Sequence, residues 1–186
     1  MITRRTLAMA AAAKNKPIRA AIYGVGHAHA RGKVEAMRTL PEFELVGVCE
    51  PDPSVPRTHE AVQGVRWPSE KEVLDDLIEF IAVESRVQQN LLYARRAINA
   101  GKFVHLDKAH GDDLVKFRDL LAEATRIGPY PAGRKDHSFP PDTLPGFAPD
   151  MLEMARVIRE GAKPSYSAEH DLMTQEVLLR VCGYKV

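Results

Sequence analysis

The feature that most constrains the fold is a short apolar run that ends at two closely spaced glycines and continues into a helical pattern. Residues 18–23 read IRAAIY, which predicts a buried strand, and residues 24–26 read GVG. Over residues 29–40 the apolar side chains recur at helical spacing, and Pro41 ends that helix. The order of strand, glycine turn and helix is typical of the first unit of a doubly wound α/β domain.

The same alternation of apolar runs and helical patterns continues through the next part of the chain. Further strands are predicted over residues 43–49, 77–83 and 103–106, and further helices over residues 69–75, 87–100 and 114–126. Ser69 and Glu72 have the spacing of a capping box at the start of one of these helices. Strands that alternate with helices imply right-handed crossovers. We therefore predict an α/β fold with a Rossmann-type parallel sheet flanked by helices.

The chain divides into four predicted segments. They are a tail at 1–16, the Rossmann domain at 17–127, a proline-rich linker at 128–149 and a C-terminal helical segment at 150–186. In the last segment, helices are predicted at about 150–159 and at 168–181. In the tail, Arg4 and Arg5 precede a short apolar stretch, as at the start of a twin-arginine export signal. A cytoplasmic protein and one exported to the periplasm both remain open.

Composition excludes several classes of partner. The chain is 45% apolar and 27% charged, which allows a buried core, and its formal net charge of +1 gives no basic excess for nucleic acid. No apolar run approaches membrane-spanning length, so neither nucleic acid nor a membrane is expected as a partner. Cys49 and Cys182 are far apart in the sequence, and we predict buried free thiols.

The glycine turn predicts a phosphate site for a dinucleotide. Gly24 permits the tight turn, and Gly26 lets a pyrophosphate approach the backbone closely. The start of the following helix offers unpaired N–H groups and a partial positive charge. The third glycine of the usual fingerprint is replaced by His29. The predicted phosphate-loop residues are Gly24, Val25, Gly26, His27 and Ala28.

Glu50, directly after the second predicted strand, is the candidate ribose ligand. A carboxylate at this position accepts hydrogen bonds from the adenosine ribose hydroxyls and repels a 2′-phosphate. The predicted cofactor is therefore NAD, with NADP as the alternative and Arg57 as its candidate phosphate partner. The other interpretation of Glu50 is a solvent-facing glutamate in a turn.

His27 and His29 also suggest a metal site. Two histidines in one loop are too few, because a site needs three or four ligands. We expect no metal here, and assign the two imidazoles to polar lining of the loop.

Three stretches resemble the N-terminal domain of the glucose–fructose oxidoreductase / inositol dehydrogenase / MocA family: IRAAIYGVGHAHARGKVEAM, FELVGVCEPDP and AINAGKFVHLDKA. In that family a Glu-Lys-Pro motif follows the last of these strands, and its proline often forms a cis bond. The resemblance implies that Lys108 is the lysine that reaches the nicotinamide ribose and the substrate. Asp107 then stands for the glutamate and Ala109 for the proline. In the segment IAVESRVQQN, it implies cofactor contacts at Ser85 and Asn90.

The resemblance implies an NAD(P)-dependent oxidoreductase that acts on a sugar or polyol, with Lys108 as its catalytic residue. It covers residues 18–126 and resumes in the closing helices, whereas the family's central substrate-binding sheet has no counterpart. We therefore expect reduced catalytic competence, because one domain alone leaves substrate unoriented. The alternatives are a non-catalytic dinucleotide-binding module and a domain-deleted fragment. A sheet face left exposed by the missing domain predicts self-association.

Overall fold

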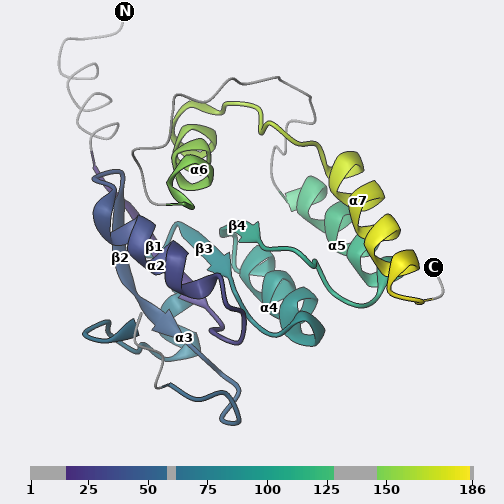
Figure 1. Cartoon of the computed structure of the whole chain (residues 1–186). Coiled ribbons are helices and arrows are strands. Elements are labelled where there is room, and N and C mark those ends of the chain that lie inside the picture. Colours follow the sequence, from purple (N-terminus) through teal and green to yellow (C-terminus); the bar gives the residue numbers. More distant parts are fainter. Residues whose placement is uncertain (1–15, 58–61, 128–145, 185–186) are drawn as a thin grey trace, which may run out of the picture.

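The computed structural model describes residues 16–57, 62–127 and 146–184, and Figure 1 draws the remaining residues as a thin grey trace. The predicted export signal and most of the proline-rich linker lie outside the described residues. No helix in the described ranges is long and apolar enough to cross a membrane. Both cysteines are free thiols; Cys49 is buried, as predicted, whereas Cys182 is exposed.

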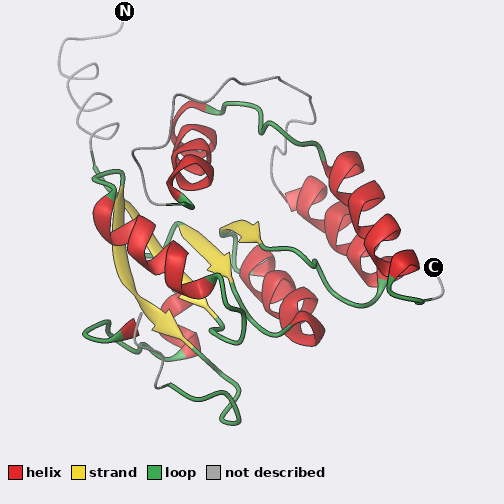
Figure 2. Cartoon of the chain, in the orientation of Figure 1, coloured by secondary structure: helices red, strands yellow, loops and turns green. Residues whose placement is uncertain are grey.

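Four parallel strands form one sheet in the order β2-β1-β3-β4 (Figure 2). The strands are β1 (Ile18–Tyr23), β2 (Phe43–Cys49), β3 (Phe80–Val83) and β4 (Phe103–Leu106). This parallel sheet with its intervening helices confirms the predicted α/β, Rossmann-type fold.

Helices cover both faces of the sheet. They are α2 (Ala30–Thr39), α3 (Glu70–Val73), α4 (Val87–Asn99), α5 (Leu114–Ile127), α6 (Ala148–Glu160) and α7 (Ala168–Val181). Successive side chains of a strand point to opposite faces. Accordingly, Ala20 and Ile22 of β1 lie in the core that includes residues of α2 and α6, whereas Ala21 and Tyr23 lie in the core that includes residues of α4 and α5.

The third strand is shorter than predicted. It begins at Phe80, whereas the apolar run suggested a start at residue 77. Leu77 is 68% exposed, and its N–H donates to Asp75 Oδ1 at 2.9 Å. The amide of Ile78 also donates to the Asp75 carbonyl, at 3.0 Å. These bonds form a turn around an aspartate side chain, and the turn takes the residues before Phe80 out of the strand.

The two C-terminal helices pack onto the Rossmann domain at separate places, α6 against α2 and α7 against α5 (Figure 1). Met151 and Ala155 of α6 are buried in the core beside α2. At the start of α6, Phe147 lies so close to Gly32 of α2 that a Cβ on this glycine would be 2.3 Å from the Phe147 ring. On α7, the side chain of Gln175 is buried.

Helices pack on both faces of the sheet, and Phe103 of the edge strand β4 is 38% exposed. The predicted self-association itself is untested by a single chain. Exposed apolar side chains do line α7, namely those of Met173, Val177 and Val181.

Candidate functional site

Each of the four strands is followed directly by a residue of the candidate site. Gly24 follows β1, Glu50 follows β2, Glu84 follows β3 and Asp107 follows β4. Because the strands are parallel, these residues meet at one edge of the sheet. Along that edge the chain order reverses between β1 and β3, which is where doubly wound sheets bind their ligands.

The glycine loop is held tightly against the segment after β3. Gly24 has a φ of +86°, and a Cβ there would lie 2.5 Å from the Cβ of Ser85. The tight turn predicted for Gly24 is therefore confirmed. A Cβ on Gly26 would lie 2.7 Å from the Cγ of Arg86. Arg86 is thus a protein neighbour that requires glycine at this second position. The close approach of a pyrophosphate to Gly26 stays a prediction.

Two backbone amides of the loop are free to bind a ligand. The N–H groups of Gly26 and Ala28, both exposed residues, have no acceptor in the described part of the chain. The other loop amides are used internally: Val25 donates to Glu50 Oε2 (2.8 Å), His27 to the Glu84 carbonyl (2.9 Å) and His29 to His27 Nδ1 (3.4 Å). Since α2 begins at Ala30, the free amides lie at the positive end of its dipole.

Glu50 is buried and ties the glycine loop to the turn after β2. Glu50 is only 2% exposed, so the alternative interpretation of this residue as a solvent-facing glutamate is wrong. Oε2 accepts from the Val25 amide at 2.8 Å, and Oε1 accepts from the Asp52 amide at 2.9 Å. The hydroxyl of Tyr93 also donates to Oε1, at 3.4 Å. The predicted ribose contact is not tested by these bonds.

A buried polar chain connects the end of β3 to the loop that carries Lys108. Ser85 Oγ donates to Asn90 Oδ1 at 2.7 Å, and Asn90 Nδ2 donates to the carbonyl of Ala109 at 2.8 Å. Ser85 and Asn90 thus bind each other, and through Asn90 they position this loop. Their predicted contacts with the cofactor remain untested. The Lys108–Ala109 peptide bond is cis, although alanine replaces the proline of the family motif. Lys108 itself is exposed at the sheet edge.

The C-terminal helix α7 also contacts the loop that carries Lys108. The Gln175 side chain accepts from the His110 amide at 3.0 Å and donates to the Gly111 carbonyl at 2.6 Å. Sequence reasoning assigned no role to Gln175, since a single glutamine within a helical pattern gives no signal of a partner elsewhere in the chain. Lys108 is therefore followed by a segment that is fixed by two different helices, α4 through Asn90 and α7 through Gln175.

The side chain at the centre of the site, Lys33 of α2, was not predicted from the sequence. It is fully buried, and its Nζ donates to Glu84 Oε1 and, at 2.7 Å, to Asp107 Oδ2. The same Nζ lies 3.2 Å from His105 Nδ1 and 5.4 Å from the centre of the Phe147 ring. The cation therefore joins the ends of β3 and β4 beneath the start of α6.

Burial and this lysine set the protonation of the neighbouring groups. Burial raises the pKa of Glu84 to about 7, against the opposing attraction of Lys33. Burial would also raise the pKa of Asp107, but the Lys33 charge and hydrogen bonds from Lys33 and His29 hold it well below its usual range. Burial and the Lys33 charge lower the pKa of His105. At neutral pH, Asp107 is thus the permanently ionised carboxylate of the site.

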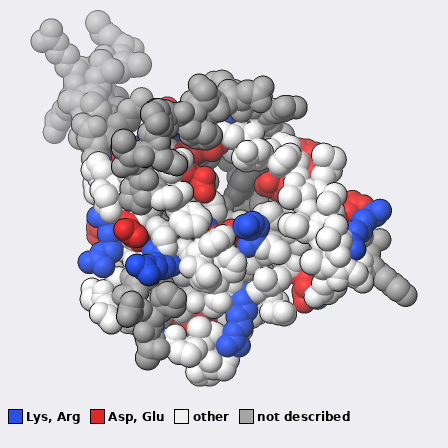
Figure 3. Space-filling view, in the orientation of Figure 1, with Lys and Arg blue, Asp and Glu red and all other residues white. Residues whose placement is uncertain are grey.

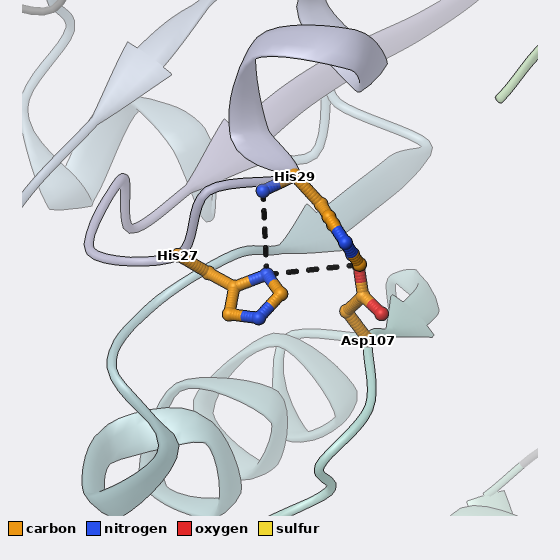
Figure 4. A group of neighbouring side chains, drawn as sticks. All are labelled: His27, His29 and Asp107. Atoms are coloured by element: carbon orange, nitrogen blue, oxygen red, sulfur yellow. Dashed lines mark hydrogen bonds and ion pairs between the residues drawn. The ribbon is translucent and has the colours of Figure 1, made fainter. Parts of the chain in front are cut away.

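His27 and His29 converge on the Asp107 carboxylate, as Figure 4 shows. His29 Nδ1 lies 2.8 Å from Asp107 Oδ2, and His27 Nδ1 lies 3.9 Å from the same oxygen. His27 Nδ1 is also 3.6 Å from Glu84 Oε2. Burial lowers the pKa of His27. The two loop histidines therefore face the ends of β3 and β4 and do more than line the loop.

Charges of both signs are mixed on the face of the molecule seen in Figure 3, which is hollowed near its centre. Phe147, which directly precedes α6, and Asp150 of α6 lie beside the buried cluster. The ring of Phe147 is 5.0 Å from that of His29, and burial raises the pKa of Asp150. The start of α6 therefore forms a wall over the carboxyl edge of the sheet.

Solved structures match the fold, although no protein-family model and no curated protein matches the sequence. Biliverdin reductase from Synechocystis sp., in complex with biliverdin and NADP+, is 21% identical over 61% of this chain, with a TM-score of 0.51. GenD2 from gentamicin A biosynthesis, in complex with NAD, is 22% identical over 61% of this chain, also with a TM-score of 0.51. D-galactose-1-dehydrogenase from Rhizobium etli is 29% identical over 60%, with a TM-score of 0.48.

The likeness concerns the Rossmann-type domain. The matched regions make up 36%, 33% and 35% of those three chains, so the chain spans about a third of the length of the structures it matches. The comparison with biliverdin reductase and GenD2 shows a shared arrangement of sheet and helices.

Proposed function

We propose that the chain binds a nicotinamide dinucleotide at the glycine loop, as the cofactor-binding part of an oxidoreductase of the glucose–fructose oxidoreductase / inositol dehydrogenase / MocA type. The observation that carries the proposal is the pair of free, exposed amides of Gly26 and Ala28 in front of α2. Such amides, together with the helix dipole, bind a pyrophosphate. Their place between β1 and β3 agrees with the position of dinucleotides in doubly wound sheets.

Glu50 supports NAD over NADP. Its buried carboxylate lies at the end of β2, beside the glycine loop, where the adenosine ribose is expected. A 2′-phosphate there would approach a carboxylate that is already withdrawn from water. Arg57 is the group that could offset this repulsion, since its guanidinium lies 3.4 Å from the Glu50 carbonyl and 5.2 Å from the centre of the Trp67 ring. Tighter binding of NADPH than of NADH would make Arg57 the determinant in place of Glu50.

Lys108 is the proposed catalytic residue, and a sugar or polyol is the proposed substrate. When bound, the cofactor supplies the hydride chemistry. The exposed Lys108 lies on a loop fixed by Asn90 and Gln175, at the same sheet edge as the glycine loop. Its ammonium group would stabilise negative charge that develops on the substrate oxygen. The proposed catalytic role therefore requires the cofactor and the substrate to bind within reach of this side chain.

The Ala28→Glu variant tests the phosphate site. Ala28 is exposed, so the new side chain disturbs no packing, and a carboxylate near a helix N-terminus stabilises the helix. Its charge would repel the pyrophosphate, and we expect NADH to bind about tenfold more weakly, equivalent to about 1.4 kcal/mol. The measurement is a titration of the purified chain with NADH, followed by fluorescence or calorimetry.

Ala28→Gln is the matched control, since it has the same size without the charge. We expect its NADH affinity to remain closer to that of the wild type than to that of Ala28→Glu. Equal NADH affinities for the glutamate and glutamine variants would place the dinucleotide elsewhere. Absence of saturable NADH binding by the wild-type chain would overturn the proposed function itself.

A further inference from the structure

Two imidazoles and two carboxylates meet beside the glycine loop. His27, His29 and Asp107 each offer one ligand atom, and these atoms lie within 4.8 Å of one another (Figure 4). A fourth candidate, Glu84 Oε2, lies 3.6 Å from His27 Nδ1. The loop histidines alone are too few for a metal site, but the fold adds a carboxylate from the end of β3 and another from the end of β4.

Glu84 supplies an independent sign that a ligand is missing. Its side chain is fully buried, and Oε1 accepts from Lys33. The second oxygen, Oε2, is buried without a hydrogen-bond partner among the described residues. A buried carboxylate oxygen with no donor is costly, so each such atom requires an explanation. Because this oxygen faces His27, a cation between the two groups would satisfy it.

We propose that His27, His29, Asp107 and Glu84 form a site for a divalent transition-metal ion of the zinc type. Imidazole nitrogens combined with carboxylate oxygens are ligands that Zn²⁺ and its neighbours in the first row bind well. In such a site each ligand atom lies about 2.0–2.2 Å from the ion, and neighbouring ligand atoms lie roughly 3.3 Å apart. Three of the separations in this cluster, 2.8, 3.6 and 3.9 Å, lie on either side of that spacing. The ligand atoms of His27, His29 and Asp107 all lie within 4.8 Å of one another, and Glu84 joins this group through its contact with His27.

Lys33 has a defined part in this site. Its ammonium binds Glu84 Oε1, the oxygen opposite the unpaired one, and it shares Asp107 Oδ2 with His29. Outer groups of this kind orient the carboxylates that bind a metal. When the ion binds, both carboxylates are ionised, and together with Lys33 they carry a net charge of one negative unit, which attracts a divalent cation. The ion would replace the contact between His29 and Asp107.

The test uses Co²⁺ and Zn²⁺ on the purified full chain after removal of bound metal with a chelator. We expect one Co²⁺ per chain, with visible absorption bands typical of coordinated nitrogen and oxygen, and displacement by Zn²⁺. The double variant His27→Ala, His29→Ala should bind Co²⁺ at least about tenfold more weakly, because two ligands are lost. Both histidines are only partly buried loop residues, so the fold should persist, and circular dichroism checks this.

His170→Ala is the control, since this histidine lies exposed on α7, away from the cluster. It should bind Co²⁺ like the wild type. Equal Co²⁺ binding by the wild type and the double variant would show an adventitious ion at other groups and overturn the proposal. A wild-type chain that binds no Co²⁺ or Zn²⁺ at millimolar concentration would overturn it as well. None of these outcomes depends on whether NADH binds.

Discussion

The Lys33→Met variant is expected to have a free energy of unfolding about 3–5 kcal/mol below that of the wild-type chain at neutral pH. Methionine keeps most of the side-chain volume but removes the ammonium that joins Glu84 to Asp107. Both carboxylates are buried, so the loss leaves charge in the interior without its partner. Denaturant unfolding followed by circular dichroism measures the difference.

Lys116→Met provides the matched control for this change. Lys116 forms its ion pair with Asp113 at the surface, 3.0 Å apart and with the lysine side chain 68% exposed. Its replacement should cost less than about 1 kcal/mol. Adding Asp107→Asn to Lys33→Met should recover part of the loss, because the carboxylate that stays ionised at neutral pH is then replaced by a neutral amide. If Lys33→Met and Lys116→Met lose equal stability, Lys33 does not hold the two strand ends together.

Gly24→Ala is expected to have the second largest effect. Two costs add at this position: the φ of +86°, which an alanine adopts poorly, and a Cβ only 2.6 Å from the Cα of Ser85. The first is worth about 1–2 kcal/mol. The second acts against backbone, which cannot move aside cheaply, and adds about 1–3 kcal/mol. The free energy of unfolding of the variant, again from denaturant titration, should fall by their sum.

Gly101→Ala separates the two costs. Gly101 also has a positive φ, of +73°, but a Cβ there would meet no atom within 4 Å. This variant should therefore lose only the conformational part, about 1–2 kcal/mol. A Gly24→Ala variant that loses no more than Gly101→Ala would mean that the glycine loop and the segment at Ser85 are not packed as closely as described.

Local patterns predicted most of the fold. The bounds of β1, β2, β4 and α7 coincide with the predicted ones, because apolar runs and helical spacing are properties of adjacent residues. Gly24 and Glu50, which directly follow strands, were found for the same reason, whereas Asp107 was named only through the family resemblance and Glu84 was missed. The start of β3 was missed, because an apolar run does not reveal the turn that Asp75 forms with the residues after it.

The buried cluster could not be predicted from the same patterns. Lys33 is 51 residues from Glu84 and 74 residues from Asp107 along the chain. Within a predicted helix, Lys33 is expected to be a solvent-exposed lysine, and no local spacing links it to acidic residues that follow other strands. The burial of Glu50 has the same origin, since its partners Val25 and Tyr93 belong to other elements. Packing across the sheet edge, which sequence periodicity does not encode, determines these contacts.

The central claim is that a nicotinamide dinucleotide binds at the glycine loop, and an NMR titration of the ¹⁵N-labelled chain with NADH tests it most directly. We expect the amide signals of Gly26 and Ala28 to shift most, because these are the free donors of the loop. The signals of the exposed face of α7 should stay in place. Largest shifts on α7, or no shifts at saturating NADH, would contradict the claim.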